Sequence, residues 1–333
     1  MKYLRLVVPV FNDWVSCRCL LQDLDRVAAS LPLRIAVSLV DDGSIDTPDF
    51  SDISTLSNLE SVEIVRLSVN LGHQRAIAIG VCVAVEDDNS DAVLIMDADG
   101  EDSPDTIAKL LEAAAGKNNF CIVAKRRKRS ENLTFRLSYL IYKYVFKLLT
   151  AKQINFGNFS LLSRSYAQRL VRIPDLWNNL PAALLRSRLP IQFIPIDRAK
   201  RYAGKSQMNF TSLVVHGLSG ISVYADTIFV RMLLLTIGMA TAAAASIGGV
   251  VTLRVFFPQY ATPGWPTTVS LGMMIILVQI FSVTLSSILM LLNSRVQRLI
   301  VPIADYRAYV EAREPLLGPG LCPLESIGIS DLQ

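Results

Sequence analysis

The sequence predicts an α/β protein with a mostly parallel sheet, followed by two transmembrane α-helices. Short apolar runs alternate with helical segments up to Ala124, and polar or acidic residues directly follow the apolar runs. Two uncharged stretches of 22 and 24 residues lie in the last third of the chain. The alternation predicts a sheet with a ligand site at its carboxyl edge, and the long stretches predict a membrane anchor.

Five apolar runs predict the strands. They cover residues 4–10, 35–40, 62–67, 93–96 and 120–124. Helices are predicted from the turn at Asp13 to about Ser30 and from about His73 to Val85, and a third is predicted to be capped by Ser103 with Pro104 at its first position. This order predicts right-handed crossovers that cover both faces of the sheet.

Side chains that can bind a nucleotide or a metal follow four of these strands. They are Asn12, Asp13, Asp41, Asp42, Asn70, Asp97 and Asp99. Asp, Asn and Gly are also ordinary turn residues, but four such strand ends favour a nucleotide-type site over coincidence. No G-x-G-x-x-G follows the first strand and no G-x-x-x-x-G-K-[ST] occurs, which disfavours dinucleotide and P-loop sites.

The acidic stretch after residues 93–96 is central to the functional prediction. In extended backbone, Asp97 and Asp99 point the same way, so both carboxylates can face one divalent ion. Mg²⁺ or Mn²⁺ shared with a substrate diphosphate suits such oxygen ligands. A solvated acidic loop is the alternative, and the other three strand ends favour the metal site.

A basic region follows the fifth strand. Residues 125–129 are all Lys or Arg, which is typical of a solvated charge run or a patch for anionic lipid. In the apolar segment Thr134–Leu149, Arg136, Lys143 and Lys147 fall on one side of a helix. We expect this helix at the membrane interface; a core helix with one wet edge is the competing interpretation.

Residues 232–253 and 269–292 are each long enough to cross the hydrocarbon core. The loop between them contains only Arg254 as a cation, and several arginines follow the second span, so we expect the loop outside and both flanks inside. The expected organisation is a catalytic domain over 1–208, a juxtamembrane helix over 209–230, a membrane region over 231–293 and a tail over 294–333, disordered from about Glu314. Small residues at 240–249 permit close helix packing and predict a homo-oligomer.

Composition narrows the possible classes. The 333 residues are 51% hydrophobic and the mean hydropathy is +0.38, which is too apolar for an ordinary soluble domain. A net charge of +4 is too small to predict nucleic-acid binding. Five scattered cysteines and two distant histidines predict neither a zinc site nor a disulfide scaffold, which indicates a reducing compartment. The run Leu4–Val10 is too short for a secretory signal, so the first domain is expected in the cytosol.

Four motifs together resemble the inverting family-two glycosyltransferases of the GT-A fold, and more narrowly the polyprenyl-phosphate glycosyltransferases related to dolichol-phosphate mannose synthase. They are Val8-Pro9-Val10-Phe11-Asn12-Asp13, Leu39-Val40-Asp41-Asp42-Gly43-Ser44-Ile45-Asp46, Asn70-Leu71-Gly72 and Met96-Asp97-Ala98-Asp99. The resemblance covers about residues 4 to 295. It implies a nucleotide-sugar donor, a divalent cation and a polyprenyl phosphate acceptor.

The resemblance also implies roles for single residues. It implies base and ribose contacts for Pro9, Phe11, Asp13 and Asp42, metal ligation for Asp97, Asp99 and Glu101, and phosphate contacts for Arg126, Arg136, Arg201 and Lys205. Arg201, Gly204 and Ser206 match a family loop of the form R-x-x-G-x-S-K, but Gln207 stands where lysine is usual. An exposed loop is the alternative to this phosphate clamp.

The segment 156–164 departs from the family pattern. Many relatives carry an aspartate, proposed as a base, where this chain has Asn158, and an arginine where it has Ser160. An amide cannot accept a proton at neutral pH. A phosphate monoester is mostly ionised at pH 7 and needs no base, so Asn158 favours a phosphate acceptor over a sugar hydroxyl.

We therefore predict a metal-dependent glycosyltransferase that moves a sugar from a UDP- or GDP-type donor to a polyprenyl phosphate with inversion. It is expected as an integral protein of a bacterial inner membrane, with the catalytic domain and both termini in the cytoplasm. Three alternatives remain: another lipid or glycan acceptor, a catalytically silent scaffold, and a processive polysaccharide synthase. The last is disfavoured because Q-x-x-R-W is absent and two spans are too few for a polymer channel.

Overall fold

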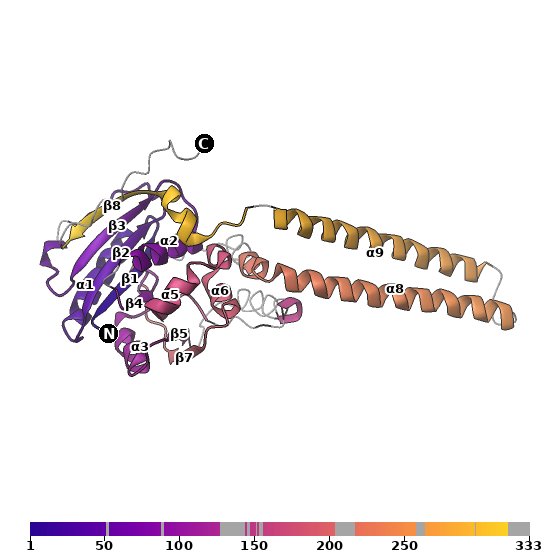
Figure 1. Ribbon diagram of the computed structural model, residues 1–333, viewed down its shortest axis with the longest axis horizontal. Coiled ribbons are helices and arrows are strands. Elements are labelled where there is room, and N and C mark those ends of the chain that lie inside the picture. Colours follow the sequence, from indigo (N-terminus) through magenta and orange to yellow (C-terminus); the bar gives the residue numbers. More distant parts are fainter. Residues whose placement is uncertain are drawn as a thin grey trace. The chain divides into compact units, whose positions relative to one another are not determined.

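The computed structural model describes residues 1–50, 53–87, 90–126, 144, 147–150, 152, 156–203, 217–257, 264–296 and 298–318. The chain divides into two compact units. The first contains the sheet and combines residues from the start, the middle and the end of the chain, and the second contains two long apolar helices. Figure 1 shows the elements of each unit.

The first unit is built on one mixed eight-stranded sheet with the order β7-β5-β6-β4-β1-β2-β3-β8. Its strands are β1 (Tyr3–Val10), β2 (Arg34–Asp41), β3 (Ser61–Leu67), β4 (Ala92–Ile95), β5 (Cys121–Arg126), β6 (Ser160–Ser163), β7 (Ile191–Ile196) and β8 (Val310–Leu317). Among these described strands, β6 and β8 run antiparallel to the rest. The predicted mostly parallel α/β sheet is confirmed.

Helices cover both faces of this sheet. They are α1 (Trp14–Ala28), α2 (His73–Glu86), α3 (Ile107–Ala114), α5 (Arg164–Leu170), α6 (Leu180–Arg186) and the short α10 (Pro302–Asp305). Ser103 stands at the N-cap position of the turn that leads into α3 and Pro104 follows it, but the Ser103 hydroxyl makes no cap hydrogen bond. The predicted cap is wrong in that respect, because this hydroxyl lies against the Asp105 carboxylate instead.

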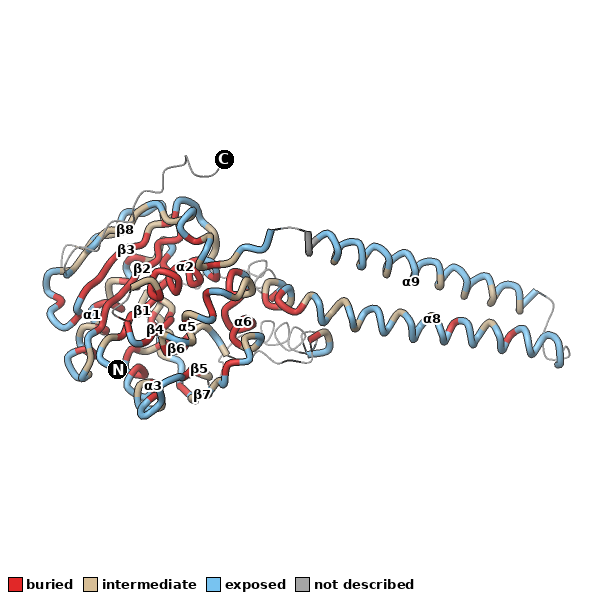
Figure 2. Tube along the Cα trace, in the orientation of Figure 1, coloured by how far each residue is buried: buried red, intermediate tan, exposed pale blue. Residues whose placement is uncertain are grey.

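Alternate residues of the central strands feed two hydrophobic cores. In β1, Leu4, Leu6 and Val8 belong to the core that also contains α1, whereas Val7 belongs to the core that contains α2. Figure 2 shows the buried residues concentrated in the strands and in α2. Helix α2 packs very closely: a Cβ on Gly80 would lie 2.3 Å from Val7 Cγ1. This close packing holds the N-terminus of α2 at the carboxyl edge of the sheet.

The last strand, β8, comes after both apolar helices and pairs antiparallel with β3. The prediction of disorder from about Glu314 is therefore wrong as far as Leu317, and residues 319–333 lie outside the described residues. The predicted limit of the first domain at residue 208 is corrected too, because this strand belongs to the same unit. Ion pairs explain the error: Arg66 binds both carboxylate oxygens of Glu314, at 2.8 and 3.0 Å, in a strand with no continuous apolar run.

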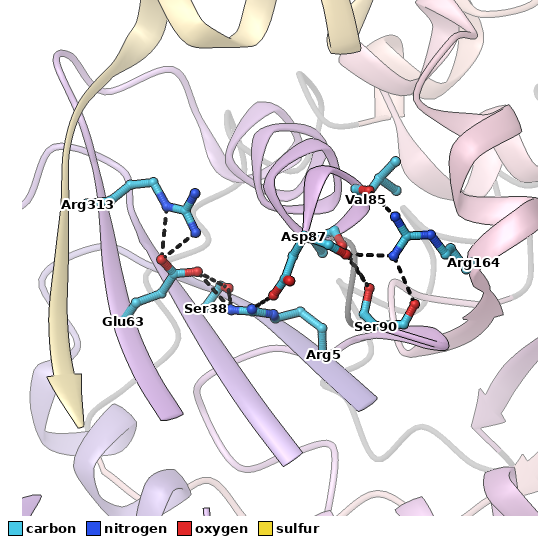
Figure 3. A network of polar contacts seen from close by, with 9 residues as sticks. Arg5, Ser38, Glu63, Val85, Asp87, Ser90, Arg164 and Arg313 are labelled. Carbon is cyan, nitrogen blue, oxygen red and sulfur yellow. Dashed lines mark hydrogen bonds and ion pairs between the residues drawn. The ribbon is translucent and has the colours of Figure 1, made fainter. Parts of the chain in front are cut away.

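A buried ionic network crosses strands β1, β2 and β3 and reaches β8 (Figure 3). The Arg5 guanidinium on β1 pairs with Glu63 on β3 at 2.9 Å and with Asp87 at the end of α2. Arg313 on β8 pairs with the other Glu63 oxygen at 2.8 Å, and Ser38 donates to Glu63 at 2.7 Å. Arg5 and Glu63 are each 1% exposed, so water cannot replace these partners.

The pair between Arg66 and Glu314 gives the first testable prediction. Lysine cannot bind two carboxylate oxygens in one plane, so Arg66→Lys is expected to weaken β8 pairing by up to about 1 kcal/mol and speed amide exchange in β8 about fivefold. Hydrogen exchange measured by mass spectrometry checks this. The hydrogen bond from Arg66 lowers the pKa of Glu314, so the pair stabilises β8 above the ordinary carboxyl pKa and is lost as the pH falls through the lowered value.

The same change at Arg34, which makes one 3.4 Å contact with Glu60 and is 71% exposed, is the control. Arg34→Lys is expected to leave β8 exchange unchanged. Equal exchange in the two variants would contradict the role given to Arg66.

The second unit contains α8 (Ala225–Phe256) and α9 (Trp265–Val296), two helices long and apolar enough to cross a membrane. Of α8, only Ala243 and Val250 are buried, seven residues apart, and the Thr284 hydroxyl of α9 donates to the Thr236 hydroxyl at 3.2 Å, seven residues before Ala243. Thr236, Ala243 and Val250 therefore lie along one side of α8, where it packs against α9. Figure 2 shows that most other positions of the two helices are exposed. Most of the predicted interfacial helix at 134–149 lies outside the described residues.

Candidate functional site

The ends of four parallel strands gather their polar side chains at one edge of the sheet. After β1, Asn12 has a positive φ of 50° and its Oδ1 accepts the backbone N–H of Ile45 at 2.9 Å. The Ser44 hydroxyl, after β2, accepts the backbone N–H of Asn12 at 2.9 Å. These reciprocal bonds join the loops that follow β1 and β2 into one wall of the site.

Asp42, at the end of β2, fixes a third loop. Its two carboxylate oxygens accept the backbone N–H groups of Leu71 at 2.7 Å and Gly72 at 2.9 Å, and the residue is 3% exposed. Burial raises the pKa of Asp42, although these two bonds favour its ionised form. The carboxylate thus holds the loop that starts α2; its predicted nucleotide contact stays a prediction.

Asp99, the second aspartate after β4, lies beside an arginine side chain. The Arg201 guanidinium is 3.3 Å from Asp99 Oδ2 and 3.8 Å from Asp13 Oδ2, so it bridges the ends of β4 and β1. Burial, followed by the negative charges of Asp97 and Glu101, raises the pKa of Asp99 against the opposing effects of the Glu101 N–H and Arg201. This crowding of carboxylates favours a bound cation.

Metal ligation by Asp97, Asp99 and Glu101 stays a prediction. Glu101 makes an ion pair with Arg198, and no group of three or more His, Cys, Asp or Glu side chains in the described part of the chain could hold a metal. Mg²⁺ commonly uses one or two carboxylates together with substrate phosphates and water. Asp97 and Asp99 fit this mode, and Glu101 as a ligand stays a prediction.

A loop after β7 runs along the acidic segment. The backbone N–H of Tyr202 donates to Asp99 O and that of Ala199 to Glu101 O, both at 3.0 Å. The Tyr202 hydroxyl donates to Asp23 on α1, and its ring lies against Gly100. This loop therefore carries Arg198 and Arg201 to the carboxylates.

A hydrogen-bonded cluster that the sequence did not predict lies on the other side of Asp97. His73 Nε2, at the N-terminus of α2, is 3.3 Å from Asp97 Oδ1 and 2.9 Å from Asn158 Nδ2. Asn158 Nδ2 is also 3.5 Å from Asp97 Oδ1, and Gln74 Nε2 donates to Asn158 Oδ1 at 3.1 Å. Two polar residues directly after Asn70-Leu71-Gly72, at the start of an otherwise apolar helix, were the available signal.

Neighbouring carboxylates determine the direction in which the pKa of His73 is shifted. Desolvation lowers its pKa, but the carboxylates of Asp97, Asp42 and Asp99 outweigh that effect and raise the pKa above its ordinary value. The side chain is 45% exposed and faces the acidic cluster. His73 therefore belongs to the candidate site together with Asn158.

A family profile described as Glycosyl transferase family 2 matches residues 6–178, more than half of the chain. The chain belongs to this family. It is therefore a glycosyltransferase, with a GT-A-like sheet followed by two long apolar helices. The resemblance inferred from the four motifs is confirmed.

Named relatives agree with this assignment. The glycosyltransferase is 24% identical over 220 residues to an uncharacterized glycosyltransferase of Synechocystis sp., covering 66% of this chain and 68% of the relative. It is 29% identical to undecaprenyl-phosphate 4-deoxy-4-formamido-L-arabinose transferase of Aeromonas hydrophila, covering 51% of each, and 28% identical to a prophage-derived bactoprenol glucosyl transferase of Shigella flexneri, covering 67% and 71%. Among solved structures, glucosyl-3-phosphoglycerate synthase of Mycobacterium tuberculosis with Mn²⁺ and UDP-glucose is similar with a TM-score of 0.48 at 14% identity, covering 68% and 79%.

Some of the other predicted site residues lie in the described part of the structure and others do not. Pro9 is buried in β1 and Phe11 is 41% exposed just beyond it. Arg126 ends β5, and Arg136 and Lys205 lie outside the described residues. Their assigned contacts with donor or acceptor stay predictions.

Gly100 gives a prediction for this glycosyltransferase. Its φ is +81°, and a Cβ there would lie 2.4 Å from the Tyr202 ring. Gly100→Ala is expected to cost about 1–3 kcal/mol of stability and to lower activity by moving the loop that carries Arg201. Gly116, with φ +73° and open space around a Cβ, is the matched control for backbone strain alone. Thermal unfolding that shows equal losses in both alanine variants would contradict the packing role of Tyr202.

Proposed function

We propose that this glycosyltransferase moves a sugar from a nucleotide diphosphate sugar to a polyprenyl phosphate at a membrane surface, with inversion and with a divalent cation. The observation that carries the proposal is the position of Arg201 between Asp13 and Asp99 at the carboxyl edge of the sheet, with Asp97 paired to His73 at the same edge. Such an edge is where open α/β sheets bind their ligands. The names of the Aeromonas and Shigella relatives support the polyprenyl phosphate acceptor.

The donor side of the reaction follows from the charges in the site. Asp97 and Asp99 carry hard oxygen ligands that would hold Mg²⁺ or Mn²⁺. When bound, the ion neutralises charge on the departing diphosphate. Arg201 can bind two phosphate oxygens at once, so its guanidinium would turn from Asp13 and Asp99 to the donor diphosphate or the acceptor phosphate.

The acceptor side needs no protein base. A phosphate monoester has lost most of its second proton at pH 7, so its oxygen can attack the anomeric carbon directly. The new bond joins that oxygen to the anomeric carbon, while the bond from this carbon to the diphosphate oxygen breaks and its electron pair leaves with the nucleoside diphosphate. Asn158 is compatible with this step because its amide orients groups and does not need to take a proton.

A membrane location is supported by the chain order. The residues up to Val223 and the β8 strand after α9 belong to the same unit, so the chain leaves this unit before α8 and rejoins it after α9. If α8 and α9 cross the bilayer, both flanks lie on one side, as we propose for a cytoplasmic catalytic unit. The acceptor phosphate would be reached at that surface.

The test is a transfer assay with the purified full chain. UDP- and GDP-sugars carrying a labelled sugar are incubated with Mn²⁺ or Mg²⁺ and undecaprenyl phosphate, dolichyl phosphate or free glycans, and label extracted with the lipid is measured. We expect metal-dependent label on a polyprenyl phosphate. Label found only on glycans would overturn the acceptor assignment, and no transfer from any donor would overturn the proposed activity.

A further inference from the structure

A buried backbone N–H begins a chain of hydrogen bonds that leads to the candidate metal site. Leu180 is the first residue of α6, where a backbone N–H has no partner within the helix. This group donates to Gln74 Oε1 at 2.8 Å, and Gln74 is 8% exposed. Because a backbone N–H can only donate, it fixes which end of the Gln74 amide faces α6.

The amide orientation that the Leu180 N–H sets in Gln74 determines the orientation of the next amide, that of Asn158. With its oxygen held by Leu180, Gln74 directs Nε2 at Asn158 Oδ1, 3.1 Å away. Asn158 must then direct its own NH₂ group the other way, toward His73 Nε2 at 2.9 Å and Asp97 Oδ1 at 3.5 Å. The usual ambiguity of amide orientation is thereby removed for both side chains.

We propose that Gln74 is a positioning residue of the glycosyltransferase: it turns the Asn158 amide so that an N–H donor, and not a carbonyl oxygen, faces Asp97 and His73. This inference rests on the proposed function for its catalytic consequence and on hydrogen-bond geometry for the arrangement itself. A donor beside Asp97 holds this carboxylate in place without competing for a cation. Outer partners of metal ligands commonly contribute 10–100-fold to affinity or activity.

The decisive variant is Gln74→Glu. Glutamate keeps an oxygen for the Leu180 N–H, so the start of α6 is preserved, but its second oxygen cannot donate to Asn158. The Asn158 amide is expected to turn over and direct its carbonyl oxygen at Asp97 and His73. Gln192→Glu is the matched control, because Gln192 is exposed on β7, where it contacts Lys117.

The first measurement needs no enzymatic activity. The chain has two histidines, so ¹⁵N-histidine labelling gives two pairs of imidazole signals, Nδ1 and Nε2 of each ring, and His216→Gln shows which pair belongs to His73. Gln74→Glu is expected to shift the His73 Nε2 resonance, since the atom facing it changes from a donor to an acceptor, while Gln192→Glu leaves it in place. In an Asn158→Ala background, Gln74→Glu is expected to cause no further shift.

The second measurement is the transfer rate of the wild type and of four variants: Gln74→Glu, Gln192→Glu, Asn158→Ala, and Gln74→Glu combined with Asn158→Ala. Gln74→Glu is expected to lower the rate 10–100-fold with an unchanged melting temperature, and to cause no further loss in the Asn158→Ala background. Additive losses, or an unmoved His73 signal, would overturn the positioning role. If the His73 signal behaves as expected but the wild type transfers no sugar, the arrangement stands and the proposed function fails.

Discussion

Replacing Asp99 with asparagine is expected to reduce sugar transfer at least 100-fold, a loss above the range of about 10–100-fold seen for outer partners of metal ligands. Asparagine keeps the size of the side chain but removes the charge that would hold the cation. It also removes the ion pair with Arg201, which lies 3.3 Å from Asp99 Oδ2. Steady-state transfer assays at increasing Mn²⁺ concentration measure the loss of transfer and whether more Mn²⁺ restores it.

The control for this variant is Asp105→Asn. Asp105 is 65% exposed and pairs with Arg26 on the surface, so the same chemical change there is expected to leave transfer within about twofold. Both variants should fold, because each preserves side-chain volume. Full activity of Asp99→Asn would remove the metal assignment.

The second large effect is expected in stability. Arg5→Met is expected to lower the free energy of unfolding of the sheet unit by about 3–5 kcal/mol, because it removes the cation that Glu63 and Asp87 share in a buried place. A domain is typically stable by about 5–15 kcal/mol, so this loss is a large part of the total. Chemical denaturation of the detergent-solubilised protein, followed by tryptophan fluorescence, measures it.

Arg34→Met is the matched control for Arg5→Met. Arg34 also lies on a strand and pairs with a glutamate, but it is 71% exposed and its contact is 3.4 Å long. Its loss is expected to cost less than about 1 kcal/mol. Similar midpoints for the two variants would show that the buried network does not stabilise the sheet.

The centre of the sheet was predictable because its strands are buried on both faces. Strands β1 to β5 differ from the predicted runs by at most two residues at either end, and α2 extends one residue beyond the predicted Val85. Parallel strands covered on two sides appear in the sequence as continuous apolar runs. Such a run can be recognised from neighbouring residues alone, without knowing the strand's partners.

The outer strands were missed for the opposite reason. β7 contains Pro195 and is half exposed, and β8 carries four charged or proline residues in Val310–Leu317. Their places in the sheet depend on partners far along the chain, such as Arg66 and Glu63 for β8. No local pattern records such a pairing, which is why a disordered tail was predicted instead.

The candidate site was predicted in part. The sequence placed Asp13, Asp97, Asp99 and Arg201 in one site; in the structure Arg201 lies beside Asp13 and Asp99, and Asp97 pairs with His73. Gln74 was missed, because a single glutamine at a helix start carries no chemical signature, and its meaning depends on the Leu180 N–H that the fold places beside it. Contacts of this kind require the three-dimensional structure.

The central claim is that a divalent metal ion at Asp97 and Asp99 holds a nucleoside diphosphate at the carboxyl edge of the sheet. The most direct measurement is anomalous X-ray scattering from crystals of the protein grown with Mn²⁺ and the preferred nucleoside diphosphate. We expect a manganese peak in contact with both aspartates and the diphosphate. A peak elsewhere, or a nucleotide bound away from the ends of β1 to β4, would contradict the account.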